Sequence, residues 1–297
     1  IKRLDVLAEV GRRYIEAAAD GAKLTSAQQA REVGESAVIA VQKRVDAGIS
    51  SPIDLFKAHT ALGLLQIKEE HAEHELIAHR RQLAAALGQS TDDFGPIQAD
   101  LLSLPDVPKY EALSAQLETS PMLARYSVEA RWRTAQLGLA QSLRRAGATI
   151  SGGLKRNEAS DSFGLVAGIS IPLAVRETNA GDIREARERR DQTAAGAEAQ
   201  RLEMQATLFE VYQEMLHART VVTTLKQDLL PSAHQTFKLA DSGYQQGRFS
   251  ILDLLDAQKS LLELEQLLIA SAATYHLHLI EIERLLGGSV QNVDTKT

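Results

Sequence analysis

Apolar residues recur every three or four positions through most of this 297-residue chain, which is the spacing of one face of an α-helix. The pattern predicts long helices over residues 1–47, 52–87, 122 to about 145, and 177–246. Pro231 interrupts the last of these helices and should kink or break it. A clearer stripe follows, with steps that average about 3.5 residues, the period of helices packed side by side. Its members are Leu254, Leu261, Leu264, Leu268, Ala272, Tyr275, Leu279, Ile282 and Leu286.

One region alternates between apolar and small residues instead, as a β-strand does. Residues 148–155 and 163–173 flank a polar turn at 156–161, so a β-hairpin is predicted. The apolar residues of the second strand share one face, and they are Phe163, Leu165, Ala167, Ile169 and Ile171. The length suits a strand that crosses a bilayer, which needs about 9–11 residues. A soluble hairpin packed on helices would show the same alternation, so the pattern leaves both interpretations open.

Residues 89–121 have a different composition, rich in Asp, Ser and Gly. Four of the seven prolines fall in this segment, namely Pro96, Pro105, Pro108 and Pro121. Because proline and glycine interrupt regular structure, the segment should be irregular, with at most short helices.

A short phrase occurs twice, at residues 44–55 and 243–254. Its matched pairs, all at one constant separation, are Gly48 with Gly247, Ser51 with Ser250, Asp54 with Asp253, and Leu55 with Leu254. The register continues without a gap to a Leu-Gly pair at 87–88 and at 286–287. Tyr14 matches Tyr212 at a separation one residue shorter, so the repeat slips by one residue near Pro231. Two copies of one helical hairpin explain this pattern.

The chemistry of the phrase predicts a tight turn between two helices. Gly48 and Gly247 supply the left-handed residue that ends a helix. The serine three residues later can cap the next helix, and the aspartate three further can complete a capping box. Pro52 suits a first helical position, where its missing N–H costs nothing. The capping box explains the spacing of Asp54 and Asp253, and we favour it over a gating or cation-attracting role for these carboxylates.

Composition and charge exclude several classes. A net charge of −6 gives no indication of nucleic-acid binding, and the absence of cysteine excludes disulfides and thiolate metal sites. One Trp, six Tyr and six Phe argue against a conventional large globular core. No apolar run approaches the roughly 18 residues that a membrane helix needs. The chain starts at Ile1 rather than Met, so we interpret it as a processed or trimmed form.

Candidate chemistry is sparse. His71, His74 and His79 lie near three glutamates on one predicted helix, and residues 71 and 74 share a face that could attract a divalent cation. We favour a solvated, charged helix face, and expect no resident metal or cofactor. No Ser/His/Asp context, phosphate loop or HExxH motif is present, so the chain is not expected to be an enzyme.

The two Gly-x-x-Ser-x-x-Asp-Leu hairpins, each ending in Leu-Gly, resemble those of the TolC-type outer-membrane efflux channels. The order of helix, strand hairpin, very long helix and helix is also similar. Ser120-Pro121 before a helix that leads into residues 150–153 resembles the family's approach to its second strand pair. Residues 168–173 and 179–183 look like the cobalt–zinc–cadmium branch of that family. From this resemblance we expect the family's first strand pair and opening helices to be missing from the sequence as given.

The resemblance implies a mainly α fold, in which long antiparallel helical hairpins form part of a trimeric α-barrel and a β-hairpin contributes to an outer-membrane β-barrel. The implied location is the outer membrane of a Gram-negative bacterium, with a large periplasmic portion. The implied partners are two further copies, outer-membrane lipid, a periplasmic adaptor protein and an inner-membrane pump. The expected layout is a first helical hairpin at 1–88, an irregular equatorial segment at 89–121, a helix at 122–146, a membrane β-hairpin at 147–173, a second helical hairpin at 177–287 and a tail at 288–297.

The resemblance also places the functional surface at the hairpin tips. The residues expected to meet the adaptor are Gly48, Ser51, Asp54, Gly247, Arg248, Ser250 and Asp253. Arg248 stands where the first copy has Ile49, so hairpin geometry does not require it. A role in tip pairing or adaptor contact and an ordinary solvated arginine both remain open for it.

Two functions follow from these expectations. The first is a passive exit duct of a tripartite efflux pump, with heavy-metal cations as the expected cargo. The alternative is a periplasmic adaptor or scaffold that uses its hairpins only for protein contacts. A strand pair with an apolar face favours the duct, because an adaptor needs no strands that face lipid.

Overall fold

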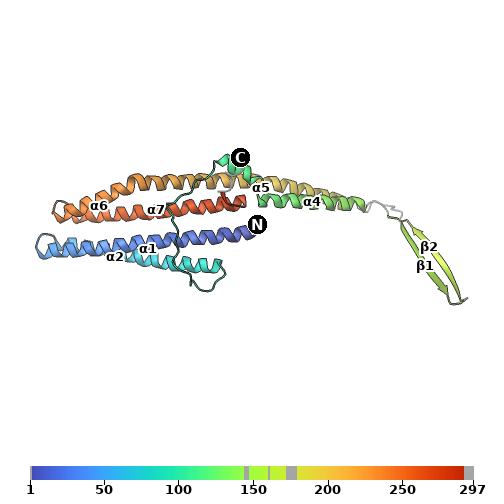
Figure 1. Cartoon of the computed structure of the whole chain (residues 1–297), viewed down its shortest axis with the longest axis horizontal. Helices are drawn as coiled ribbons and strands as arrows, with labels where there is room; N and C mark the ends of the chain where they lie inside the picture. The colour runs from blue at the N-terminus through green and yellow to red at the C-terminus, as the bar shows by residue number, and fades with distance from the viewer. Residues whose placement is uncertain (1, 144–146, 160, 172–178, 291–297) are drawn as a thin grey trace. The chain divides into compact units, whose positions relative to one another are not determined.

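The computed structural model of the chain describes residues 2–143, 147–159, 161–171 and 179–290 (Figure 1). Its elements in order are α1 (Lys2–Asp46), α2 (Pro52–Ala86), α3 (Tyr110–Leu117), α4 (Pro121–Ser142), β1 (Thr149–Asn157), β2 (Ser162–Ser170), α5 (Ala180–Thr224), a π-helical turn η1 (Leu225–Leu229), α6 (Leu230–Gln245) and α7 (Ile251–Leu286). These elements form two compact units. One comprises residues 1–117 and 205–297, and the other residues 118–204.

Two helical hairpins build the first unit. α1 and α2 pair as one hairpin, α6 and α7 pair as the second, and α1 lies beside α7 (Figure 1). The core near the turns draws on all four helices and consists of Val41, Ala58, Ala240, Tyr244, Ile251, Leu254 and Ala257. A second core cluster lies further along and consists of Ala18, Ala19, Leu101, Val222, Leu225, Leu230, Leu268, Ala272 and Ala273. Because alanine lets helices approach closely, these cores need few aromatic side chains.

The segment between α2 and α4 is irregular apart from α3, as predicted. It is nevertheless held against the helices of the first unit. Leu101 is buried in the second core cluster, and the hydroxyl of the fully buried Tyr275 donates to the carbonyl of Pro105. Tyr110 packs edge-on against Phe209 of α5, with ring centroids 5.2 Å apart.

The predicted interruption at Pro231 takes the form of the π-helical turn η1, which directly precedes α6. A π-helical turn bonds i to i+5 and therefore holds one more residue than the α-helical turn it replaces. This extra residue explains why the repeat slips by one position between Tyr212 and Gly247. Pro231 sits in the first turn of α6, where its missing N–H is tolerated.

The second unit contains α4, the start of α5 and an antiparallel β-hairpin. The hairpin register pairs Ile150 with Ile169 and Leu154 with Leu165. The side chains on its apolar face are exposed, up to 89% for Leu165. Within the described ranges no helix covers this face, which therefore does not fit a soluble hairpin packed on helices of the same chain. The described helices also contain no stretch apolar and long enough to cross a bilayer.

The element boundaries differ from the expected ones by a few residues. α4 begins at Pro121 because Ser120 caps it, its hydroxyl accepting from the N–H of Leu123 at 3.4 Å. β1 continues to Asn157, so the polar turn is shorter than predicted. The expected helix end at 144–146, the strand end at 172–173, the helix start at 177–178 and the tail after 290 lie outside the described residues.

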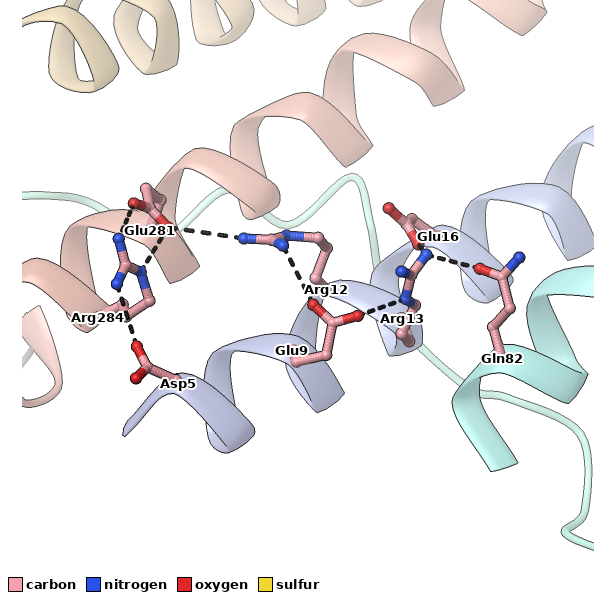
Figure 2. Close-up of polar contacts among 8 residues, drawn as sticks. All are labelled: Asp5, Glu9, Arg12, Arg13, Glu16, Gln82, Glu281 and Arg284. Carbon is pink, nitrogen blue, oxygen red and sulfur yellow. Dashed lines mark hydrogen bonds and ion pairs between the residues drawn. The ribbon is translucent and has the colours of Figure 1, made fainter. Parts of the chain in front are cut away.

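A ladder of ion pairs joins α1 to α7 far from the hairpin turns (Figure 2). Arg284 holds Glu281 on its own helix at 2.6 Å and reaches Asp5 of α1 at 3.2 Å. Arg12 of α1 reaches back to Glu281 at 3.7 Å. These carboxylates and hydrogen bonds raise the pKa of Arg284 above its ordinary value, with the hydrogen bond to Glu281 as the main cause.

The ladder continues along α1 towards α2 (Figure 2). Glu9 accepts from Arg12 at 3.2 Å and from Arg13 at 2.7 Å. Arg13 in turn donates to Glu16 at 3.0 Å and to Gln82 of α2 at 2.6 Å. Shared carboxylates therefore link α1 to α7, and the amide of Gln82 extends the network to α2; such a network is worth more than isolated surface pairs.

We expect Arg284→Gln to lower the free energy of unfolding by about 1 kcal/mol, because the substitution removes an inter-helical pair whose guanidinium is largely covered. Thermal unfolding of the purified protein measures this change. The matched control is Arg189→Gln, which removes an exposed pair within one helix, with Glu185 at 2.5 Å, and should cost less than about 0.5 kcal/mol. Equal effects for the two variants would show that the ladder adds nothing.

Candidate functional site

Both hairpin turns close as the repeat predicts. Gly48 and Gly247 adopt φ values of +69° and +71°. The amides that follow them return to the end of the preceding helix, with Ile49 N–H donating to the Arg44 carbonyl and Arg248 N–H to the Gly243 carbonyl, each at 2.8 Å. The Leu-Gly pairs at the far ends also match, since Gly88 and Gly287 have φ values of +75° and +81°. The repeat is therefore present in the backbone itself.

Both predicted capping boxes are confirmed. Ser51 accepts from the N–H of Ile53 at 3.2 Å, and its own N–H donates to Asp54 at 3.3 Å. In the second turn Ser250 accepts from the N–H of Asp253 at 3.3 Å, and its N–H donates to the Asp253 carboxylate at 2.9 Å.

The second capping box has one hydrogen bond more than the first. The Ser250 hydroxyl also donates to the Asp253 carboxylate, at 2.7 Å. Hydrogen bonds from this hydroxyl, and then from the Ser250 backbone, lower the pKa of Asp253 because they favour the charged carboxylate.

Arg44 links the two hairpins, and sequence reasoning did not find it. It lies in the last turn of α1, and its Nη1 donates to the carbonyls of Tyr244 at 3.1 Å and Gln245 at 3.2 Å, at the end of α6. Its guanidinium also sits 4.9 Å from the centroid of the Tyr244 ring. A cation is well placed there because the last carbonyls of a helix have no partner within the helix and carry partial negative charge. A further bond to Ser50 at 3.2 Å fixes Arg44 to its own turn.

The repeat held a signal for this contact. The position of Arg44 is occupied by Gly243 in the second copy. A side chain at Gly243 would collide with the ring of Phe249, because an added Cβ would lie 2.1 Å from Phe249 Cδ2. The two turns therefore differ in chemistry. The first contributes the Arg44 side chain, and the second contributes the backbone carbonyls that accept from it, with Phe249 packed beside Gly243.

Arg248 does not make this link. Its guanidinium contacts Gln246 within its own turn and is exposed. Of the two tip arginines, the structure brings Arg44 and not Arg248 between the hairpins. The residues expected to meet an adaptor nevertheless gather at these two turns, with Asp54 and Asp253 occupied as caps.

The histidines of α2 fall into separate environments. His71 is exposed and lies 3.4 Å from Glu75 on the same helix. His79 instead pairs with Asp20 of α1, whose side chain is only 3% exposed and also binds Lys23 at 3.0 Å. The expectation of a solvated face is therefore wrong for His79. In the described part of the chain no three His, Asp or Glu side chains form a group that could hold a metal ion.

Comparison with known proteins identifies the family. The sequence model of the outer membrane efflux protein family matches residues 112–288, more than half of the chain. The chain belongs to the outer membrane efflux protein family. It is 28% identical over 285 residues to the cobalt-zinc-cadmium resistance protein CzcC of Cupriavidus metallidurans, a match that covers 96% of this chain and 68% of CzcC.

Two solved structures share the fold of this chain. CusC superimposes with a TM-score of 0.83 at 19% identity, covering 96% of this chain and 69% of CusC. VceC from Vibrio cholerae gives a TM-score of 0.81 at 18% identity, covering 97% of this chain and 71% of VceC. The predicted resemblance and the mainly α fold class with a β-hairpin are confirmed.

As a member of this family, the protein is an exit duct of the outer membrane with a periplasmic portion. The predicted localisation and exit-duct role are confirmed, and the alternative of a periplasmic adaptor is not favoured. The family is one of efflux proteins of the outer membrane.

Removal of the Ser250 cap should have a measurable effect on stability. We expect Ser250→Ala to lower the free energy of unfolding by about 1 kcal/mol, because the N–H of Asp253 in the first turn of α7 loses its acceptor. Ser36→Ala is the control, since its hydroxyl only bonds the Glu32 carbonyl of its own helix at 3.0 Å.

The same variant tests the pKa of Asp253. A carboxylate with a lowered pKa adds stability above its ordinary pKa of 3.8, and this stability is lost as the pH falls towards the lowered value. Ser250→Ala should therefore flatten the loss of stability below that pH. An unchanged acid profile in unfolding titrations would contradict the role of the Ser250 hydroxyl.

Proposed function

We propose that this protein is the outer-membrane component of a tripartite efflux pump and passively conducts heavy-metal cations out of the cell. The proposal that the cargo is a heavy-metal cation is supported by the 28% identity of this chain to a cobalt-zinc-cadmium resistance protein over 96% of the chain. The periplasmic hairpins would receive cargo from an inner-membrane pump through an adaptor, and the β-hairpin would open the route through the outer membrane.

Assembly as a homotrimer is part of this proposal. A two-stranded hairpin has open edges, and it cannot stand in lipid unless neighbouring strands close them. The first unit also leaves apolar side chains of α2 exposed, including Ile53, Phe56, Leu64 and Ile67. Further copies of the chain would cover these surfaces as parts of an α-barrel and a β-barrel.

In the proposed layout the tips point towards the adaptor. The hairpins at 1–88 and 177–287 would form the periplasmic barrel, with 89–121 as a band around it and 147–173 in the membrane. Arg44 would hold the two tips together and keep the periplasmic end narrow. Arg248, exposed beside Gly247, would contact the adaptor together with Gly48, Ser51 and their capping aspartates.

Deleting the gene should reduce the tolerance of cells to cobalt, zinc or cadmium, and expression of the protein should restore it. Growth in graded metal concentrations measures the effect, with a non-metal toxic compound as the control. Unchanged metal tolerance would contradict the proposal that the cargo is a heavy-metal cation.

Light scattering of the detergent-solubilised protein tests the proposed trimer, and a monodisperse monomer would contradict it.

Arg44→Gln should raise the single-channel conductance in planar bilayers, because the α6 carbonyls lose the cation that ties them to α1. Arg248→Ala is the matched tip variant, and it should leave conductance unchanged while weakening co-purification of the adaptor. If Arg44→Gln changes nothing and Arg248→Ala raises conductance, the roles are exchanged. If neither variant changes either readout, neither arginine serves the tip.

A further inference from the structure

The β-hairpin register separates its side chains into two faces with different chemistry. The apolar face contains the pairs Ile150–Ile169, Gly152–Ala167, Leu154–Leu165 and Arg156–Phe163. The opposite face contains Ser151–Gly168, Gly153–Val166, Lys155–Gly164 and Asn157–Ser162. In membrane barrels the apolar face meets lipid and the face of small and polar residues meets the interior. The second face is therefore the one suited to water.

Lys155 is the one ionisable residue on this second face within β1 and β2. Its partner across the ladder is Gly164, which has no side chain to cover it. Lys155 is exposed, and in the described ranges no side chain forms an ion pair with it. The ammonium group is thus an uncompensated positive charge on an otherwise neutral surface.

The neighbouring cation is placed differently. Arg156 lies on the apolar face, where it pairs with Asp161 at 2.9 Å and stacks 5.4 Å from the centroid of Phe163. Its charge is therefore compensated and directed away from the polar face. Glu158 is the remaining charged residue of the turn, on the order of 10 Å along the chain from Lys155. That separation is about one Debye length in 0.1 M salt, so Glu158 offsets Lys155 only in part.

We propose that Lys155 lines the water-filled interior of the duct, where one copy from each protomer forms a ring of positive charge at the membrane end of the pathway. This inference rests on the proposed trimeric duct. A ring of like charge lowers the local concentration of cations and raises that of anions. Lys155 thereby sets the ionic selectivity of the membrane end of the duct.

The reversal potential of the full-length trimer in planar bilayers, under a KCl gradient, tests this role. Lys155→Gln removes one charge and should raise the permeability of K⁺ relative to Cl⁻ by about threefold, the effect of roughly one unit of thermal energy. Lys155→Glu changes the charge by two and should raise this ratio by about sevenfold. Arg156→Gln is the matched control on the other face and should leave the ratio unchanged. The difference between variants should shrink at 1 M KCl, where the Debye length is about 3 Å.

A second variant measures exposure to water directly. The chain contains no cysteine, so Lys155→Cys introduces a single thiol on this polar face. A positively charged, water-soluble thiol reagent should restore the wild-type ratio of K⁺ to Cl⁻ permeability, and a negatively charged reagent should raise the ratio further. Arg156→Cys should show neither response.

The outcomes separate the two levels of the proposal. If the wild-type protein forms no channel, the proposed duct fails and this inference fails with it. If the channel forms but Lys155→Glu and the modified Lys155→Cys keep the wild-type ratio, Lys155 does not line the pathway and the duct itself stands. If Arg156→Gln shifts the ratio and the Lys155 variants do not, the two faces of the hairpin are exchanged and the inference is overturned.

Discussion

The contact between α1 and α7 is the constraint on which the first unit depends. Each helical hairpin buries only a narrow stripe of alanine and leucine, so neither has a core of its own. α1 and α7 bring the two hairpins together, and the buried clusters draw on residues from both. The polar contacts follow the same line: Ser26 of α1 donates to Glu265 of α7 at 2.7 Å, and the buried Gln258 donates to the Ala30 carbonyl at 2.9 Å. We call this α1–α7 contact the seam; it joins the two helical hairpins into one compact unit.

The polar contacts between the two hairpins differ at the two ends of the unit. Far from the turns, a ladder of arginines and carboxylates links α1, α7 and α2 through several shared partners. At the turns, a single arginine reaches from α1 to the carbonyl end of α6. If one bond of the ladder is lost, the other bonds of that network remain. If Arg44 is lost, its contact between the two turns is removed altogether.

The β-hairpin has the opposite character. Nothing in the described chain covers its apolar face, and both of its edges are open. Such a surface is unstable in water and makes sense only where lipid and neighbouring strands complete it. The arrangement of charge follows from the same logic: Arg156 on the apolar face is compensated by Asp161 and Phe163, while Lys155 on the small, polar face is left for water.

The amino-acid sequence by itself determined the local structure and the family. Glycine, serine, aspartate and proline at the two turns act through contacts within a few residues, so the positive φ values and both capping boxes could be predicted from their spacing. The same holds for the hairpin's alternation and for the one-residue slip that the structure resolves as a π-helical turn. The tertiary structure alone decided which side chains meet across the seam. Arg44 and Arg248 both lie near the hairpin turns in the sequence, yet only Arg44 reaches the other hairpin. His79 belongs to a charged helix face by pattern, yet it pairs with the buried Asp20. Both outcomes depend on the rotation and offset of helices far apart in the chain, which packing sets and local sequence does not encode.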